Sequence, residues 1–137
     1  MVAGGATILY IGTTTVFVPQ DLAFMGVMPE QLHAVNPRLV PLIAHDRAGF
    51  GGGLLSTGLI VALCTWCGAP SRSLWEALLC AGLAGFGCAI GVHLVVGYTD
   101  PSHLGPAVAG ALLFVAGLIL TRRPMHRGAG AAATSQP

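Results

Sequence analysis

The chain has 137 residues, of which 54% are hydrophobic and 8% are charged, and its formal net charge is +1. Soluble domains carry roughly a quarter charged residues, so this composition excludes an ordinary water-soluble globule. So small a net charge also excludes the strongly basic surface that binds nucleic acid. We therefore expect an integral membrane protein whose first partner is the lipid bilayer.

Four apolar stretches predict an all-α fold, a bundle of four transmembrane helices. A helix needs about 20 apolar residues to cross the hydrocarbon core of a bilayer, and the sequence shows none of the ten-residue alternation typical of membrane barrels. The expected helices cover residues 2–18, 37–67, 74–98 and 101–121. Together they form one transmembrane domain over 1–123, followed by a disordered tail over 124–137.

The first expected helix is the shortest, and it is closed by Pro19. A secretory signal would carry positive charge near its start, and Met1–Thr7 carries none. We therefore expect a retained spanning helix rather than a cleaved peptide.

Prolines and capping residues predict where the other helices begin. Pro29 predicts a short interfacial helix, Glu30–Val35, between the first two spans. Asn36-Pro37 and Asp100-Pro101 each place a capping residue before a proline at the first helical position. Ser73-Leu74-Trp75-Glu76 has the spacing of a capping box for the third span.

Glycines one helical turn apart predict close helix packing. The pairs are Gly49 with Gly53 and Gly87 with Gly91. Small residues at this spacing let two helix backbones approach, so we interpret the glycines as packing positions rather than as part of a site.

Basic residues near the helix ends predict the orientation. The loop between the second and third spans and the C-terminus hold Arg72, Arg122, Arg123 and Arg127, against Arg38 and Arg47 on the other side. The positive-inside tendency then places both termini in the cytoplasm. The absence of lysine beside abundant alanine, glycine and arginine indicates a GC-rich bacterial genome, and hence the bacterial cytoplasmic (inner) membrane.

With that orientation, most acids and histidines gather at the non-cytoplasmic end. His45, Asp46 and Arg47 lie together at the start of the second span, and His93 lies about 7 Å inside the end of the third. An ionisable group at such depth marks a functional site with a partner. These four residues are the predicted ligand or partner cluster. The second-rank candidates for a ligand or partner site are His33, Arg38, Tyr98, Asp100 and His103.

Two readings of His93 remain open. With His45 on a facing helix it could hold a haem, a chlorophyll-like pigment or a metal ion. In the plainer reading a neutral His93 donates a hydrogen bond to a nearby carbonyl, while Asp46 pairs with Arg47 or Arg38.

The cysteines allow a redox or zinc hypothesis, which their location weakens. Cys64 and Cys67 form a C-x-x-C pair, with Cys80 and Cys88 further along. The pair falls on the expected cytoplasmic, reducing side, where structural disulfides are rare. Cys88 near mid-membrane would behave as a small apolar residue.

The segments Asn36–Pro41 and His45–Gly52, with Asp21–Gly26 and Gly97–Asp100, carry a family resemblance. They resemble a group of small bacterial polytopic membrane proteins with a His-Asp-Arg-x-Gly-Phe-Gly-Gly start to the second helix, over most of residues 15–105. Some relatives are joined to, or described as, dihydroorotate-dehydrogenase-like proteins. The resemblance implies a membrane or quinone association, but these 137 residues show no flavin domain for that reaction.

Three functions follow as hypotheses. The first is a non-catalytic accessory or assembly module, working as a homo-oligomer or within a larger membrane complex. The second is a haem- or metal-binding protein of electron transfer near the quinone pool, with His45 and His93 as ligands. The third is an enzyme acting on a lipid or quinone through His45 and Asp46 as an acid–base pair, and it has the least support.

Overall fold

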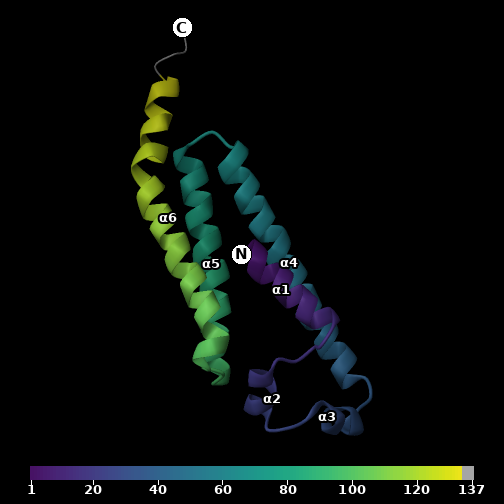
Figure 1. Ribbon diagram of the computed structural model, residues 1–137. Coiled ribbons are helices and arrows are strands. Elements are labelled where there is room, and N and C mark those ends of the chain that lie inside the picture. Colours follow the sequence, from purple (N-terminus) through teal and green to yellow (C-terminus); the bar gives the residue numbers. More distant parts are fainter. Residues whose placement is uncertain (134–137) are drawn as a thin grey trace. The chain divides into compact units, whose positions relative to one another are not determined.

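The computed structural model describes residues 1–133, with side chains described for residues 1–126. Over these residues all regular structure is helical, in six helices α1 to α6 (Figure 1), and no strand is present. The chain divides into two compact units, Met1–Ile60 and the part beginning at Val61, which are described one by one. The all-α prediction is confirmed.

Three helices are long and apolar enough to cross a membrane. They are α4 (Leu39–Cys67), α5 (Arg72–Val96) and α6 (Pro101–Ala133), the last over its Pro101–His126 stretch. Even the 25 residues of α5 extend about 37 Å at 1.5 Å per residue, which exceeds a hydrocarbon core of about 30 Å.

The first expected span is shorter than predicted. Helix α1 covers Val2–Thr13, 12 residues, or about 18 Å. The hydroxyl of Thr13 donates to Leu9 O (2.9 Å) and that of Thr14 to Tyr10 O (2.6 Å). Such local bonds let threonine compete with the helical pattern. The backbone then turns away through Val16, which has φ +63°.

Within the first unit α1 packs antiparallel along α4, and the contact depends on glycines. At four positions a Cβ atom would collide with the backbone of the other helix. Gly5 faces Leu55, Gly12 faces Ala48, Gly51 faces Leu9 and Gly58 faces Val2. The two backbones can approach this closely only because these four residues have no side chain.

The glycine pairs predicted from one-turn spacing are not the ones in contact. A Cβ added at Gly49, Gly53, Gly87 or Gly91 would meet no atom within 4 Å. The packing glycines of α4 are instead seven residues apart, at Gly51 and Gly58. Two turns of a helix take about seven residues, so this spacing also keeps both on one face.

Two short helices lie between α1 and α4. Helix α3 (Pro29–Val35) confirms the expected helix at Glu30–Val35. Helix α2 (Pro19–Met25) differs from the prediction, in which Pro19 closes the first span. Proline at the first helical position followed by an acid two residues later is in fact a start signal.

Helix α5 begins earlier than predicted. Ser71 caps it by accepting a hydrogen bond from Leu74 N (3.2 Å). Glu76 does not complete a capping box with Ser73, since its carboxylate accepts from Arg72 Nε at 2.7 Å, one turn earlier. The helix ends at Val96, where Gly97 takes the left-handed conformation (φ +74°).

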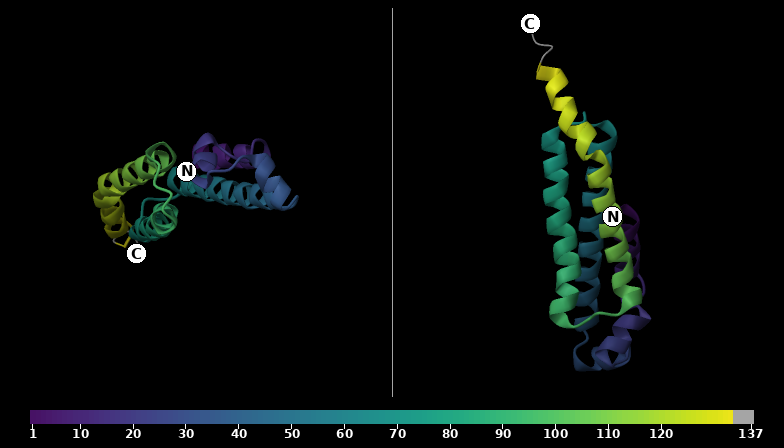
Figure 2. Two further views of the ribbon diagram at one scale, coloured as in Figure 1. Left: turned by 90° about the horizontal axis from the view of Figure 1, so that it is seen from below. Right: turned by 90° about the vertical axis from the view of Figure 1, so that its left-hand side faces the viewer.

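In the second unit α5 and α6 run antiparallel side by side (Figure 2). The buried apolar side chains Leu78, Leu118 and Met125 join them, with Val61 of α4 packed alongside. The indole N–H of Trp75 donates to Leu118 O at 2.8 Å, which adds a polar link between the helices.

Helix α6 runs past its predicted end at residue 121. It continues through Pro124 to Ala133, into the segment 124–137 for which the sequence predicts a disordered tail; that tail stays a prediction. Proline removes one helical hydrogen bond and strains the preceding turn, but the following residues are rich in alanine, the best helix former. Residues 134–137 lie outside the described part.

Candidate functional site

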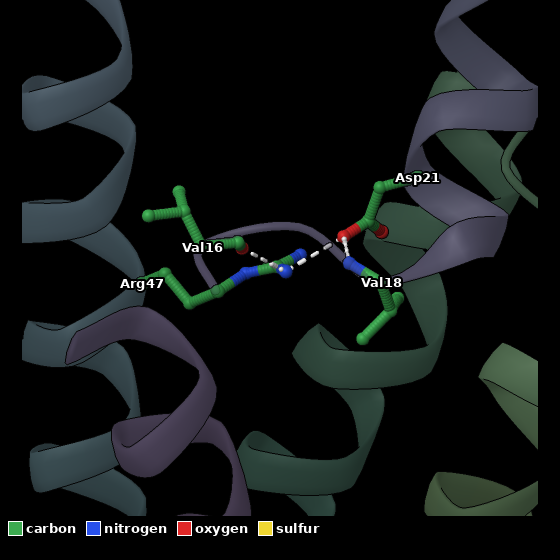
Figure 3. A network of polar contacts seen from close by, with 4 residues as sticks. All are labelled: Val16, Val18, Asp21 and Arg47. Atoms are coloured by element: carbon green, nitrogen blue, oxygen red, sulfur yellow. Dashed lines mark hydrogen bonds and ion pairs between the residues drawn. The ribbon is translucent and has the colours of Figure 1, made fainter. Parts of the chain in front are cut away.

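In the first unit, Arg47 ties the loop after α1 to α4. Its Nη1 atom lies 2.6 Å from Asp21 Oδ2 and donates to Val16 O, also at 2.6 Å (Figure 3). Asp21 Oδ2 additionally accepts from Val18 N at 2.9 Å. The Asp21 side chain is 7% exposed and that of Arg47 is 22% exposed. A nearly buried ion pair of this kind holds three chain segments in place.

Val16 marks the strained point of this arrangement. A φ of +63° is the left-handed region, which is a genuine outlier for a β-branched residue. The conformation is held because Val16 N donates to Ile11 O (2.8 Å) and Val16 O accepts from Arg47. The strain is thus offset by the two hydrogen bonds that it makes possible.

His45 and Asp46 face outward beside this ion pair. The Nδ1 atom of His45 lies 3.1 Å from Asp46 Oδ1, and the two side chains are 82% and 72% exposed. This differs from the expected pairing of Asp46 with Arg47 or Arg38. Arg47 pairs with the buried Asp21 instead. Asp46 and Arg47 are adjacent residues of one helix, and such neighbours do not face each other.

In the second unit, three aromatic rings gather where α5 passes into α6. The rings of Tyr98 and His103 are stacked, with centroids 4.4 Å apart. The ring of His93 lies 5.3 Å from that of His103 and 5.9 Å from that of Tyr98. His93, one of the four residues of the predicted cluster, therefore meets two of the second-rank candidates, Tyr98 and His103.

A hydrogen bond fixes the tautomer of His93. Its Nδ1 atom lies 2.6 Å from Ala89 O one turn earlier, and a carbonyl can only accept. Nδ1 therefore carries the proton, and the lone pair of the neutral ring lies on Nε2. This is the hydrogen bond anticipated in the plainer reading of His93.

Asp100 caps α6, as predicted. Its Oδ1 accepts from Ser102 N (2.9 Å) and His103 N (3.0 Å). Hydrogen bonds from the Ser102 hydroxyl and then from the His103 backbone lower the pKa of this carboxyl, and the nearby His103 adds to the effect. The carboxylate therefore stays charged beside the ring cluster.

The predicted cluster is divided between the two units. His45, Asp46 and Arg47 belong to the first and His93 to the second, so the pairing of His45 with His93 stays a prediction. His33 and Arg38 have exposed side chains at α3 and just before α4. Sequence reasoning missed Val16 and Asp21 as partners of Arg47. The Pro-x-Asp start of α2 was the available signal for Asp21.

The described residues bear on the metal and redox hypotheses. That part of the chain holds no group of three or more His, Cys, Asp or Glu residues able to bind a metal ion. Cys64, Cys67, Cys80 and Cys88 are exposed free thiols. An apolar groove of about 400 Å³ lies between α5 and α6, lined by residues such as Leu83, Phe86 and Phe114.

No protein-family model, no curated protein and no solved structure matches this chain. The resemblance to small bacterial membrane proteins therefore stays a prediction.

Proposed function

We propose that the chain is an integral membrane protein in which α4, α5 and α6 span the bilayer and the shorter α1 packs inside it against α4. Support comes from large apolar side chains exposed along the long helices. Leu63, Trp66, Val95, Leu113 and Leu120 are all at least 60% exposed. An apolar surface of this extent needs lipid or another protein to cover it.

Within this proposal the protein is a non-catalytic accessory or assembly module. The observation that carries this proposal is a difference in burial between adjacent residues at the start of α4. Arg47 is held by Asp21, while His45 and Asp46 form an exposed polar pair on that fixed base. An exposed polar pair next to an anchored residue suits contact with a partner subunit or a lipid headgroup, because the helix start that carries it is held in place before binding.

The proposed location is the bacterial inner membrane, with the C-terminus and the loop between α4 and α5 in the cytoplasm; the N-terminus, predicted to lie there too, would need α1 to cross, and its 12 residues are too few. Support comes from Arg72, Arg122 and Arg123 near one end of the spans. Consecutive spans alternate in direction, so the start of α4 and the end of α5 share the non-cytoplasmic side.

Single cysteines test the spans and their orientation. In a background with the four native cysteines replaced by serine, Thr99→Cys should react with a membrane-impermeant maleimide on intact cells. Ala69→Cys should react only after lysis. Labelling of both, or of neither, before lysis would contradict the proposed topology, and extraction of the protein by alkaline carbonate would contradict membrane integration.

Photo-cross-linking tests the accessory role. Leu42 is 58% exposed and lies one turn before Asp46, so a photoreactive residue there samples the same side of α4. A discrete protein adduct should form in native membranes and vanish with His45→Ala and Asp46→Ala. The control position is Trp66, 89% exposed near the far end of α4, and it should yield lipid adducts. Absence of a protein adduct at Leu42, or an adduct indifferent to both variants, would reject the role.

A second candidate function is electron transfer through haem or metal held by His45 and His93. The observation favouring it is the bond from His93 Nδ1 to Ala89 O, since ligating histidines usually donate their other ring N–H to a carbonyl or carboxylate. An optical spectrum of the detergent-purified protein tests it. A Soret band or stoichiometric metal that disappears in His45→Ala and in His93→Ala would support it, and a clear, metal-free spectrum would reject it.

A further inference from the structure

The turn between α5 and α6 brings two histidines together. Gly97 ends α5 in a left-handed conformation and Asp100 starts α6 by capping it. Between them the chain reverses, so His93 on the last turns of α5 and His103 on the first turn of α6 have ring centroids 5.3 Å apart. Both side chains are partly exposed, so a solute can reach them.

The ring separation fits two ligands of one small ion. When two imidazole nitrogens bind one metal ion at about 2.0 Å and near a tetrahedral angle, their ring centres lie roughly 5 Å apart. Two axial ligands on opposite faces of a haem iron would hold the ring centres roughly 6 Å apart and in line. The observed 5.3 Å therefore favours ligands at an angle over ligands in line.

The surroundings of both rings also suit a cation. The bond to Ala89 O leaves the lone pair of His93 on Nε2, the nitrogen that would bind the ion. The Tyr98 ring stacks on that of His103 at 4.4 Å and restricts its orientation. The Asp100 carboxylate, bonded to His103 N at 3.0 Å, adds negative charge nearby.

We propose that His93 and His103 form a two-imidazole site for a divalent transition-metal ion of the Cu²⁺ or Zn²⁺ type, with water completing the coordination. Imidazole nitrogen is a preferred ligand of these ions. Tyr98 is a positioning residue that keeps the His103 ring facing its partner. The proposed site is independent of the accessory role. It differs from the haem or metal hypothesis in that the partner of His93 is His103 and not His45.

The test is a titration of the full chain, purified in detergent through a tag without histidine and stripped of metal. One equivalent of Cu²⁺ should bind, with an electron paramagnetic resonance spectrum that shows nitrogen ligands, and Zn²⁺ should compete for the site only in excess, because such sites bind Cu²⁺ more tightly. His93→Ala and His103→Ala should each weaken binding by more than about tenfold. Tyr98→Phe keeps a stacking ring and should retain binding, whereas Tyr98→Ala should weaken it.

His126 provides a matched control. Its Nδ1 makes the same kind of bond, to Arg122 O at 2.7 Å, and its ring contacts that of Trp75 rather than an imidazole. His126→Ala and His45→Ala should therefore leave Cu²⁺ binding unchanged. Loss of binding in His45→Ala with retention in His103→Ala would assign the ion to the His45–His93 pair and overturn the proposal.

Chemical modification of the wild-type chain tests the site without any variant, so a variant that fails to fold does not affect the result. In the wild-type chain, diethylpyrocarbonate modification read by mass spectrometry should fall at His93 and His103 when Cu²⁺ or Zn²⁺ is added, and stay constant at His33 and His126. Equal modification of all histidines with and without metal, or no saturable binding, would overturn the proposal.

Discussion

Arg47 Nη1 and Asp21 Oδ2 lie 2.6 Å apart although 26 residues separate them in the sequence. The pair joins α2 to α4, and the same guanidinium nitrogen also binds Val16 O. One side chain of α4 thereby fixes both the loop that ends α1 and the helix that follows. The exposed His45 and Asp46 directly precede Arg47 on the same helix.

Removing one partner of this pair should destabilise the first unit strongly. Asp21→Ala leaves the Arg47 guanidinium without its charge partner in a largely buried place, and we expect a loss of about 3 kcal/mol in unfolding free energy. The double variant Asp21→Leu with Arg47→Met should lose less than the sum of the losses in Asp21→Leu alone and in Arg47→Met alone, because no unpaired charge remains. Unfolding in mixed detergent micelles, followed by circular dichroism, measures all of these; additive losses would show that the two residues are uncoupled.

Val16→Gly should be neutral or stabilising, against the usual cost of placing glycine in an ordered segment. Glycine adopts positive φ without the steric penalty of a β-branched side chain, which is roughly 1–2 kcal/mol. The control is Val18→Gly, two residues further along the same loop. Val18 has φ −97° and ψ 161°, so glycine there brings only its entropic cost and should destabilise. Destabilisation of equal size at both positions would contradict the assigned strain.

Gly51→Ala and Gly53→Ala should change stability in opposite directions. At Gly51 the new Cβ would lie 2.7 Å from Leu9 Cα on α1, and such overpacking costs about 1–3 kcal/mol. At Gly53 the added methyl meets no atom within 4 Å, so the better helix propensity of alanine should stabilise by up to about 1 kcal/mol. The same micelle unfolding measurement compares both variants, and destabilisation by both would show that Gly53 also lies in a contact.

The parts of the fold that could be predicted are those set by local sequence. Apolar runs gave three long helices, proline gave the start of α3, and Asp100-Pro101 gave the capped start of α6. Each of these signals acts within one or two turns of its own helix. The length of the apolar runs and the lack of an alternating pattern sufficed for the all-helical class.

The sequence predictions were wrong or incomplete where the structure depends on contacts between distant segments or on two competing local signals. The threonines and Val16 end α1 early, against the apolar pattern that favours a longer helix. Which glycines pack depends on the face of α4 that α1 covers, which one-turn spacing does not reveal. The meeting of His93 with His103 needs the geometry of the turn at Gly97.

Acid should weaken the start of α6 through Asp100. The folded pKa of this carboxyl is lowered, chiefly by hydrogen bonds from the Ser102 hydroxyl and the His103 backbone. Its stabilising contribution is therefore complete above the unfolded pKa, about 3.9, and is lost as the pH falls through the lower folded pKa. The stability difference between wild type and Asp100→Ala, measured from pH 7 to pH 2, should shrink only at the acidic end. A difference that is constant over this range would contradict a role for the charged carboxylate.

Trp75→Phe should destabilise the second unit while Trp66→Phe should not. The Trp75 indole N–H donates to Leu118 O at 2.8 Å, across the contact between α5 and α6. Phenylalanine retains an aromatic ring but loses this donor, and we expect a loss of about 1 kcal/mol. Trp66 is 89% exposed, so the same substitution there removes no contact within the unit. The measurement is the unfolding free energy of each variant in the same micelles, compared with that of the wild type. Equal effects would mean that the indole bond adds nothing to the packing of Leu78, Leu118 and Met125 around it.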